Sequence, residues 1–166
     1  MFRTVEDFLS TWAYERESTL KVFSKLTDES LNREISSGQR TIARLAWHIA
    51  HTVPEMLNRT GLNVSGAENS SPAPSSVQEI ISEYTLASQS AADEIKNSWN
   101  DATLLEEDDM YGMQWKRGTT LSILINHQAH HRGQLTVLMR QEGLIVPGVY
   151  GPSKEEWVSY GMEPEE

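Results

Sequence analysis

Residues 119–143 read TTLSILINHQAHHRGQLTVLMRQEG, and this stretch predicts one long helix. Thr119 or Thr120 is suited to the N-cap, and Gly143 stands where a left-handed residue would end the helix. Apolar side chains recur at helical spacing and define one face suited to burial: Leu121, Leu124, Ile125, Leu135 and Leu138. The stretch therefore indicates an amphipathic helix.

Two histidines continue the apolar stripe of this helix. His127 and His131 lie four residues apart, which separates them by about 40° around a helix of 3.6 residues per turn. Both imidazoles therefore project from the same face of the helix. Two ligands from one helix must share a face in order to bind the same metal ion. Two buried histidines that hydrogen-bond to backbone or to a carboxylate give the same pattern. A third histidine from another helix would distinguish the two cases.

The composition limits the possible chemistry. A chain of 166 residues is long enough to form one domain with its own core. It has no cysteine, which excludes disulfides, thiolate catalysis and cysteine-based zinc sites. The net charge of −10 argues against nucleic-acid binding, which needs a concentrated basic surface. No secretory or membrane-spanning segment is found, so we expect a cytoplasmic protein without membrane association.

Three further helices are predicted upstream, over residues 3–26, 41–58 and 77–99. Thr4 and Asp7 resemble a capping box for the first of them. Ser75 or Ser76 is expected to cap the third, with Glu79 as the reciprocal partner. Residues 61–76 are rich in serine, proline and glycine, which is typical of an exposed crossover.

Two segments around the last helix are less regular. Residues 101–117 are expected to contain a turn or hairpin centred on Gly112. The acidic run 106–109 is expected to be a solvated loop, because its carboxylates lack the spacing and central glycine of a calcium-binding EF-hand loop. The C-terminal tail contains glycines and prolines that preclude a long element, although Ser153 is suited to cap a short turn through Glu156. Its apolar residues are expected to cover one end of the molecule or to line a pocket.

These helices predict an all-α protein, a four-helix bundle with a long crossover after the second helix. Residues 1–166 are expected to form this single domain. In the second helix, His48 borders the apolar face, whereas His51 falls in a mostly polar stripe with Arg44 and Glu55. His48 is therefore the better candidate for an inward-facing ligand.

Side chains on facing helices of a bundle can build a metal site. We expect His48 to meet His127 and His131 there. Three imidazoles with one open position are typical of a catalytic site, because a closed structural zinc site uses a fourth protein ligand. Nitrogen ligands favour zinc or nickel, and iron and copper are also compatible.

Residues 127–135, HQAHHRGQL, resemble the HxxHHRGQ hallmark of the DinB-like (DNA-damage-inducible, YfiT-like) metal-dependent family. Residues 45–50, LAWHIA, resemble its second-helix histidine motif, and residues 143–151 resemble the tail of a Bacillus-type branch. The likeness covers most of the chain in order and spacing. It implies up-down-down-up topology, a homodimer, and a divalent metal on three histidines. Carried over residue by residue, the ligands are His48, His127 and His131, and His130 is the motif's non-ligand histidine.

The same resemblance implies a function. Characterised members of the family include thiol-dependent transferases and isomerases that use the metal to bind a small thiol such as bacillithiol or mycothiol. The resemblance thus favours a thiol S-transferase, in which the metal lowers the pKa of the bound thiol for attack on a small electrophile. A metal-dependent hydrolase, a non-catalytic metal-binding stress protein and a metal-free bundle with buried histidines are the alternatives. Glu55, Tyr111 and Tyr150 are candidate helpers, but none is an unambiguous general base.

Other residues near the histidine motif have separate expected roles. Gly133 is expected to permit close approach of another helix, within the bundle or in a dimer. Arg132 is expected either to pair with an acid across the bundle or at an interface, or to be solvated. Gln134 or Asn126 is expected to hydrogen-bond an imidazole, unless both amides face water.

Overall fold

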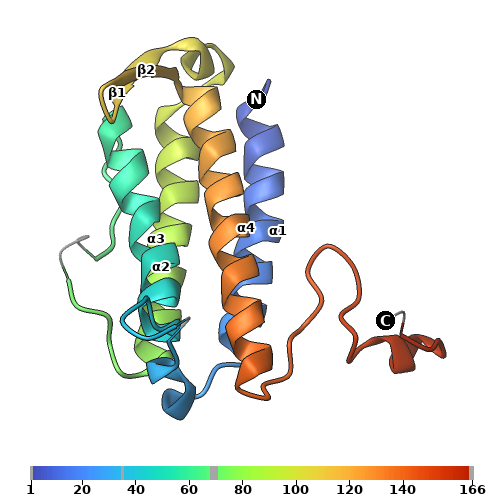
Figure 1. Ribbon diagram of the computed structural model, residues 1–166. Helices are drawn as coiled ribbons and strands as arrows, with labels where there is room; N and C mark the ends of the chain where they lie inside the picture. Colours follow the sequence, from blue (N-terminus) through green and yellow to red (C-terminus); the bar gives the residue numbers. More distant parts are fainter. Residues whose placement is uncertain (1, 35, 68–70, 165–166) are drawn as a thin grey trace.

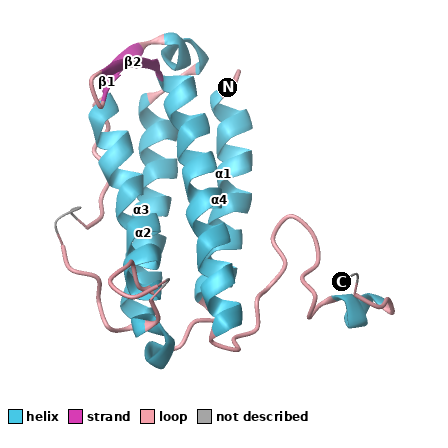
Figure 2. Cartoon of the chain, in the orientation of Figure 1, coloured by secondary structure: helices cyan, strands magenta, loops and turns pink. Residues whose placement is uncertain are grey.

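Four long helices pack side by side in the computed structural model, which describes residues 2–34, 36–67 and 71–164 (Figures 1 and 2). They are α1 (Val5–Phe23), α2 (Ile42–Leu57), α3 (Val77–Ser98) and α4 (Arg117–Gln141). Short 3-10 helices lie at Asp28–Asn32, Asn58–Thr60, Asp101–Leu105 and Trp157–Tyr160. The predicted all-α four-helix bundle is confirmed.

The four helices follow the up-down-down-up order. Figure 1 shows α1 and α4 running in one direction and α2 and α3 in the other. Helix α2 packs against α3 and α4, and α1 packs against the same two helices. Because α2 and α3 are parallel neighbours, the chain must return along the whole bundle between them, and the described residues 61–67 and 71–76 belong to this crossover. Helices α2 and α4 are antiparallel neighbours, which places their facing side chains in contact.

The helix N-termini are capped partly as predicted. Thr4 Oγ1 accepts a hydrogen bond from the Asp7 N–H at 3.0 Å, so the predicted capping box at α1 forms in its Thr4 half only. The Ser76 side chain makes no capping bond at α3, so the predicted capping box with Glu79 is wrong. The carboxylate of Asp28 replaces it by accepting from the Val77 N–H at 2.7 Å. A full negative charge at a helix N-terminus interacts more strongly with the exposed N–H groups than a hydroxyl does.

A two-stranded antiparallel hairpin leads into α4, with β1 at Glu107–Met110 and β2 at Met113–Lys116. Its two turn residues, Tyr111 and Gly112, have φ of 59° and 83°, so the expected turn at Gly112 is confirmed. The acidic run contributes to β1 rather than to a loop. Asp108 binds the Arg117 guanidinium at 2.8 Å. This contact helps to start α4 at Arg117 with Lys116 as its N-cap, three or four residues before the predicted N-cap at Thr119 or Thr120.

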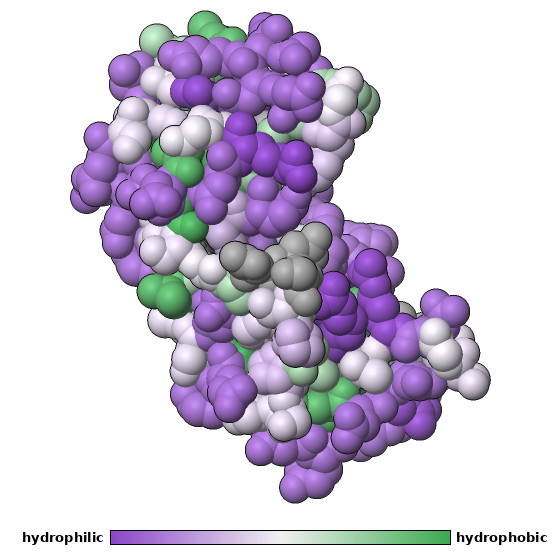
Figure 3. Space-filling model, turned by 90° about the vertical axis from the view of Figure 1, so that its left-hand side faces the viewer, coloured by the Kyte–Doolittle hydropathy of each residue, from purple (hydrophilic) through white to green (hydrophobic). Residues whose placement is uncertain are grey.

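The core lies between the four helices and contains large aromatic and aliphatic side chains. Its fully buried members include Phe8, Trp12, Phe23, Leu45, Ile49, Ile80, Tyr84 and Ile95. Trp12 donates its indole N–H to the Ser88 carbonyl oxygen at 2.9 Å, so its one polar group is satisfied. One face of the surface, shown in Figure 3, is mainly hydrophilic with small separate apolar groups. Within the described ranges, no helix combines the length and apolar character needed to cross a membrane.

The C-terminal tail leaves α4 at Gly143, which has the predicted positive φ of 70°. It then packs against the side of α1, through bonds from Lys21 Nζ to the Gly148 carbonyl at 3.1 Å and from the Tyr14 hydroxyl to the Val149 carbonyl. Residues 146–153 and α4 line an open pocket of about 270 Å³. Of the two expected positions, the tail therefore adopts the one that lines a pocket.

A buried ion pair joins α1 to α4. Arg132 Nη2 lies 2.7 Å from Glu15 Oε2, and Arg132 Nη1 donates to Thr19 Oγ1 at 3.0 Å. The Tyr150 hydroxyl of the tail donates to Glu15 Oε1 at 2.8 Å and accepts from Arg132 at 2.6 Å. Arg132 thus has its acidic partner across the bundle, one of the two roles expected for it.

Candidate metal centre

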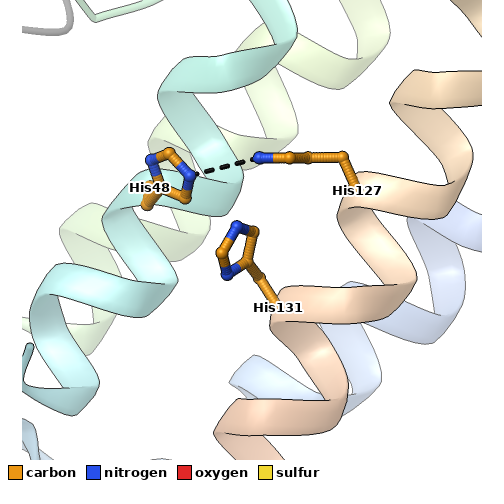
Figure 4. A group of neighbouring side chains, drawn as sticks. All are labelled: His48, His127 and His131. Carbon is orange, nitrogen blue, oxygen red and sulfur yellow. Dashed lines mark hydrogen bonds between the residues drawn. The ribbon is translucent and has the colours of Figure 1, made fainter.

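The structure brings the three predicted histidines together between α2 and α4. His48 projects from α2, and His127 and His131 project from successive turns of α4 (Figure 4). His48 Nε2 lies 3.2 Å from His127 Nε2. One ring nitrogen from each of the three side chains lies within 4.8 Å of the others, a geometry in which they could hold a metal ion. This cluster forms because α2 and α4 are antiparallel neighbours and present these positions to each other.

The three imidazoles are neutral near pH 7. Burial, followed by the neighbouring rings of His131 and His127, lowers the pKa of His48 to about 3. Burial and then His131 and His130 lower the pKa of His127 to about 4. Burial also lowers the pKa of His131, against an opposing effect of its hydrogen bond to Gln134. A neutral imidazole has a free lone pair on one nitrogen, which is the form that binds metals.

Gln134 orients one of the three rings. Its Oε1 lies 2.8 Å from His131 Nδ1, which leaves Nε2 of that ring free. Figure 4 shows a nitrogen of His131 pointing toward the space between the other two rings. Gln134, rather than Asn126, is therefore the amide that bonds an imidazole. His130 lies on the exposed side of α4, where its Nε2 contacts Gln134 Nε2 at 3.2 Å.

His51 is the residue near the cluster that sequence reasoning placed wrongly. Its expected stripe was mostly polar, but its side chain is only 1% exposed and its Nε2 lies 3.4 Å from His48 Nδ1. Helix α2 is buried around most of its circumference, since Ala43, Ala46, Trp47 and Ala50 are also buried. The signal was available in the sequence: a helix that is apolar nearly all round is expected to be enclosed.

A pocket of about 380 Å³ opens beside His48 and His127. Its lining combines the two helices with the hairpin: His48, His51, Thr52, Glu55, Met56, Tyr111, Trp115, Ile123 and His127. The Tyr111 hydroxyl donates to Glu55 Oε2 at 2.7 Å, and Arg59 donates to Glu55 Oε1 at 2.9 Å. Two of the three candidate helpers, Glu55 and Tyr111, therefore lie at the cluster, whereas Tyr150 is engaged with Glu15 and Arg132.

Comparison with known sequences agrees with this arrangement. A model of the DinB family matches residues 1–166. The chain belongs to the DinB family. Uncharacterized protein YrdA of Bacillus subtilis is 44% identical over 163 residues, which cover 98% of each chain.

Solved structures of other DinB proteins share the fold. A DinB-like protein from Bacillus cereus is 45% identical, with a TM-score of 0.87 over 90% of this chain and 100% of that one. The DinB-like protein YjoA from Bacillus subtilis is 16% identical, with a TM-score of 0.67 over 86% of this chain and 97% of that one. At that identity, the second likeness shows the fold alone.

The histidine cluster of this DinB protein fits a divalent cation. Nδ1 of His127, the ring nitrogen on the side away from His48, is buried and has no hydrogen-bond partner in the described parts of the chain. Its Nε2 faces His48, and the resulting set of three neutral nitrogen donors matches catalytic zinc sites that keep one position open. The pocket beside the cluster leaves room for a small ligand at such a position.

Proposed function

We propose that this DinB protein holds a divalent metal on His48, His127 and His131. We also propose that it is a thiol S-transferase, which joins the sulfur of a small thiol to a small electrophile. The observation that carries the proposal is the convergence of three neutral imidazoles at the wall of a pocket. Zinc or nickel is the expected ion, because three nitrogen donors without a cysteine suit either. When bound, the metal supplies Lewis-acid chemistry that lowers the pKa of a coordinated thiol or water.

The pocket walls account for substrate size and orientation. Trp115, Ile123 and Met56 offer apolar surface beside the histidines, which excludes water and packs against an uncharged electrophile. A volume of about 380 Å³ suits a small molecule rather than a macromolecule. The proposed partners are therefore a low-molecular-weight thiol and a small-molecule substrate.

Glu55 is the proposed proton acceptor in this pocket. It is the carboxylate of the pocket lining, and both its oxygens already accept bonds, from Tyr111 and from Arg59. These donors fix the carboxylate next to the histidines, and each oxygen retains a lone pair for a further proton donor. The proton that an incoming thiol releases would pass to a carboxylate oxygen of Glu55. Tyr111 then acts by holding that oxygen in place.

The assembly and the cellular location are also proposed from the resemblance to the family. We propose a cytoplasmic homodimer, which leaves the histidine pocket within each protomer, since α2, α4 and the hairpin of one chain already line it.

Metal analysis and turnover together test the proposed function. The purified protein is expected to contain about one zinc or nickel ion per chain, and a chelator is expected to lower its melting temperature. His127→Ala should abolish the metal content, whereas His130→Ala should preserve it. Conjugation of a thiol to a model electrophile should require both the metal and the thiol.

Each alternative function predicts a different result. Metal-dependent hydrolysis of an ester without thiol would indicate the hydrolase, and bound metal without turnover of either kind would indicate the non-catalytic metal-binding protein. Metal-free protein whose stability does not respond to added zinc or nickel would overturn the metal site itself.

A further inference from the structure

A fourth buried histidine lies directly behind one of the three proposed ligands. His51 follows His48 by three residues on α2, and its ring meets that of His48 edge to face, with centroids 5.0 Å apart and planes at 74°. His51 Nε2 lies 3.4 Å from His48 Nδ1. The side chain is 1% exposed, although it also contributes to the wall of the pocket beside the cluster.

The position of this contact determines which nitrogen of His48 carries a proton. His48 faces His127 with its Nε2, at 3.2 Å. A metal can bind that atom only through a lone pair, so with metal bound the ring proton of neutral His48 is on Nδ1. Without metal, one of the two Nε2 atoms must donate across the 3.2 Å contact, and for this tautomer of His48 the donor is His127. Nδ1–H then donates to Nε2 of His51, whose own proton is on Nδ1, a buried atom with no hydrogen-bond partner among the described residues. The opposite tautomer of His48 would point a proton at the common centre of the three rings.

His131 shows the same arrangement with a different partner. Its Nδ1 lies 2.8 Å from the Gln134 Oε1, an atom that can only accept a hydrogen bond. Two of the three rings thus have an acceptor on the side away from the cluster. Histidine ligands in metal sites usually donate their second N–H to such an acceptor, which fixes the tautomer and the ring orientation.

We propose that His51 is a positioning residue of the metal centre: it selects the Nδ1–H tautomer of His48 and directs its Nε2 to the metal. The inference rests on the proposed function. An imidazole is a neutral acceptor, so it leaves the positive charge of the cation less compensated than a carboxylate behind the ring would. That condition favours the ionisation of a coordinated thiol.

Two variants separate the hydrogen bond from the packing of the side chain. His51→Leu removes the acceptor and fills similar space, whereas His51→Gln retains an acceptor. In competition with a chromogenic chelator, His51→Leu is expected to bind zinc about 10- to 100-fold more weakly than wild type. His51→Gln is expected to recover most of the affinity. Val22→Ala, which removes fully buried atoms from α1, a helix that carries none of the three histidines, controls for a general loss of stability and should keep wild-type affinity.

Nitrogen-15 NMR of the wild-type protein without metal tests the inference independently of any variant. Two-bond correlations within the His48 ring should report a proton on Nδ1, and His51→Leu should show a mixture of both tautomers. A proton on Nε2 of His48 in the wild type would overturn the inference, as would equal zinc affinity of His51→Leu and wild type. Wild-type protein that binds neither zinc nor nickel would instead overturn the proposed function, while the NMR measurement still decides the role of His51.

Discussion

Arg132 of α4 and Glu15 of α1 form an ion pair with an Nη2–Oε2 distance of 2.7 Å, although the two residues are only 2% and 3% exposed. Removing one partner leaves the other charge buried and uncompensated. Arg132→Met is therefore expected to reduce the free energy of unfolding by about 3–5 kcal/mol. Urea denaturation measures this change.

A double variant identifies the origin of that loss. Arg132→Met combined with Glu15→Leu removes both charges and is expected to be more stable than Arg132→Met alone, because no unpaired carboxylate remains. If the double variant is as unstable as the sum of the two single variants, the loss comes from packing rather than from the unpaired charge.

The metal-free protein is expected to lose stability as the pH falls below about 6.5. The folded-state pKa values of His48 and His127 are about 3 and about 4, below the unfolded value of 6.5. Between these limits the unfolded chain binds more protons than the folded chain, so protonation favours unfolding. Denaturation midpoints in urea at pH 7.5, 6.0 and 5.0 measure the effect.

Substitution of the two titrating rings provides the control for this pH dependence. The double variant His48→Gln with His127→Gln should show a flatter response between pH 7.5 and 5.0 than the wild type. An equally steep response would assign the pH dependence to other groups.

Glu55→Gln is expected to lower the rate of thiol conjugation by about 10²- to 10⁴-fold, the range typical of a removed general base. The amide keeps the shape of the side chain and can still accept from Tyr111 or Arg59, so metal content should be unchanged. Steady-state kinetics of the metal-loaded protein measure the loss. Glu79→Gln, at an exposed position of α3, should retain full activity. If Glu55→Gln turns over as fast as the wild type, Glu55 is not the proton acceptor, and its role is to hold the hairpin through Tyr111.

Gly133→Ala is expected to stabilise the protein by about 0.5–1 kcal/mol. A Cβ at this position meets nothing within 4 Å, and alanine is favoured over glycine inside a helix. Thermal melts measure the gain, and Gly148→Ala provides the contrast because its Cβ would lie 2.3 Å from the Gly151 carbonyl oxygen. A Gly133→Ala protein that dissociates into monomers during light scattering would place this residue in a dimer contact instead.

The fold could be predicted because apolar residues recur at helical spacing in all four segments, although α2 is apolar around most of its circumference. The crossover and the hairpin turn carried strong local signals from serine, proline and glycine. The start of α4 and the cap of α3 were missed, because Asp108 and Asp28 act across contacts that no local pattern records. Tertiary contacts of this kind override local capping preferences.

The candidate site was predictable to the extent that it depends on helix geometry. The spacing of His127 and His131 on one helix requires them to share a face, and the inward stripe of α2 indicated His48. The burial of His51 could not be read from its own mostly polar stripe, but it agrees with the apolar character of α2 around most of its circumference. The close approach expected at Gly133 was wrong for the bundle, since the glycine lies on the outer surface of α4.

His48 and His127 are 79 residues apart in the chain, yet their ring nitrogens lie 3.2 Å apart. An ion bound between them would act as a reversible cross-link that closes a long loop, in a protein whose sequence has no cysteine for a disulfide. Such a cross-link reduces the conformational entropy of the unfolded chain and connects α2 to α4. Cellular metal supply would then influence how long each molecule survives proteolysis as well as how fast it works.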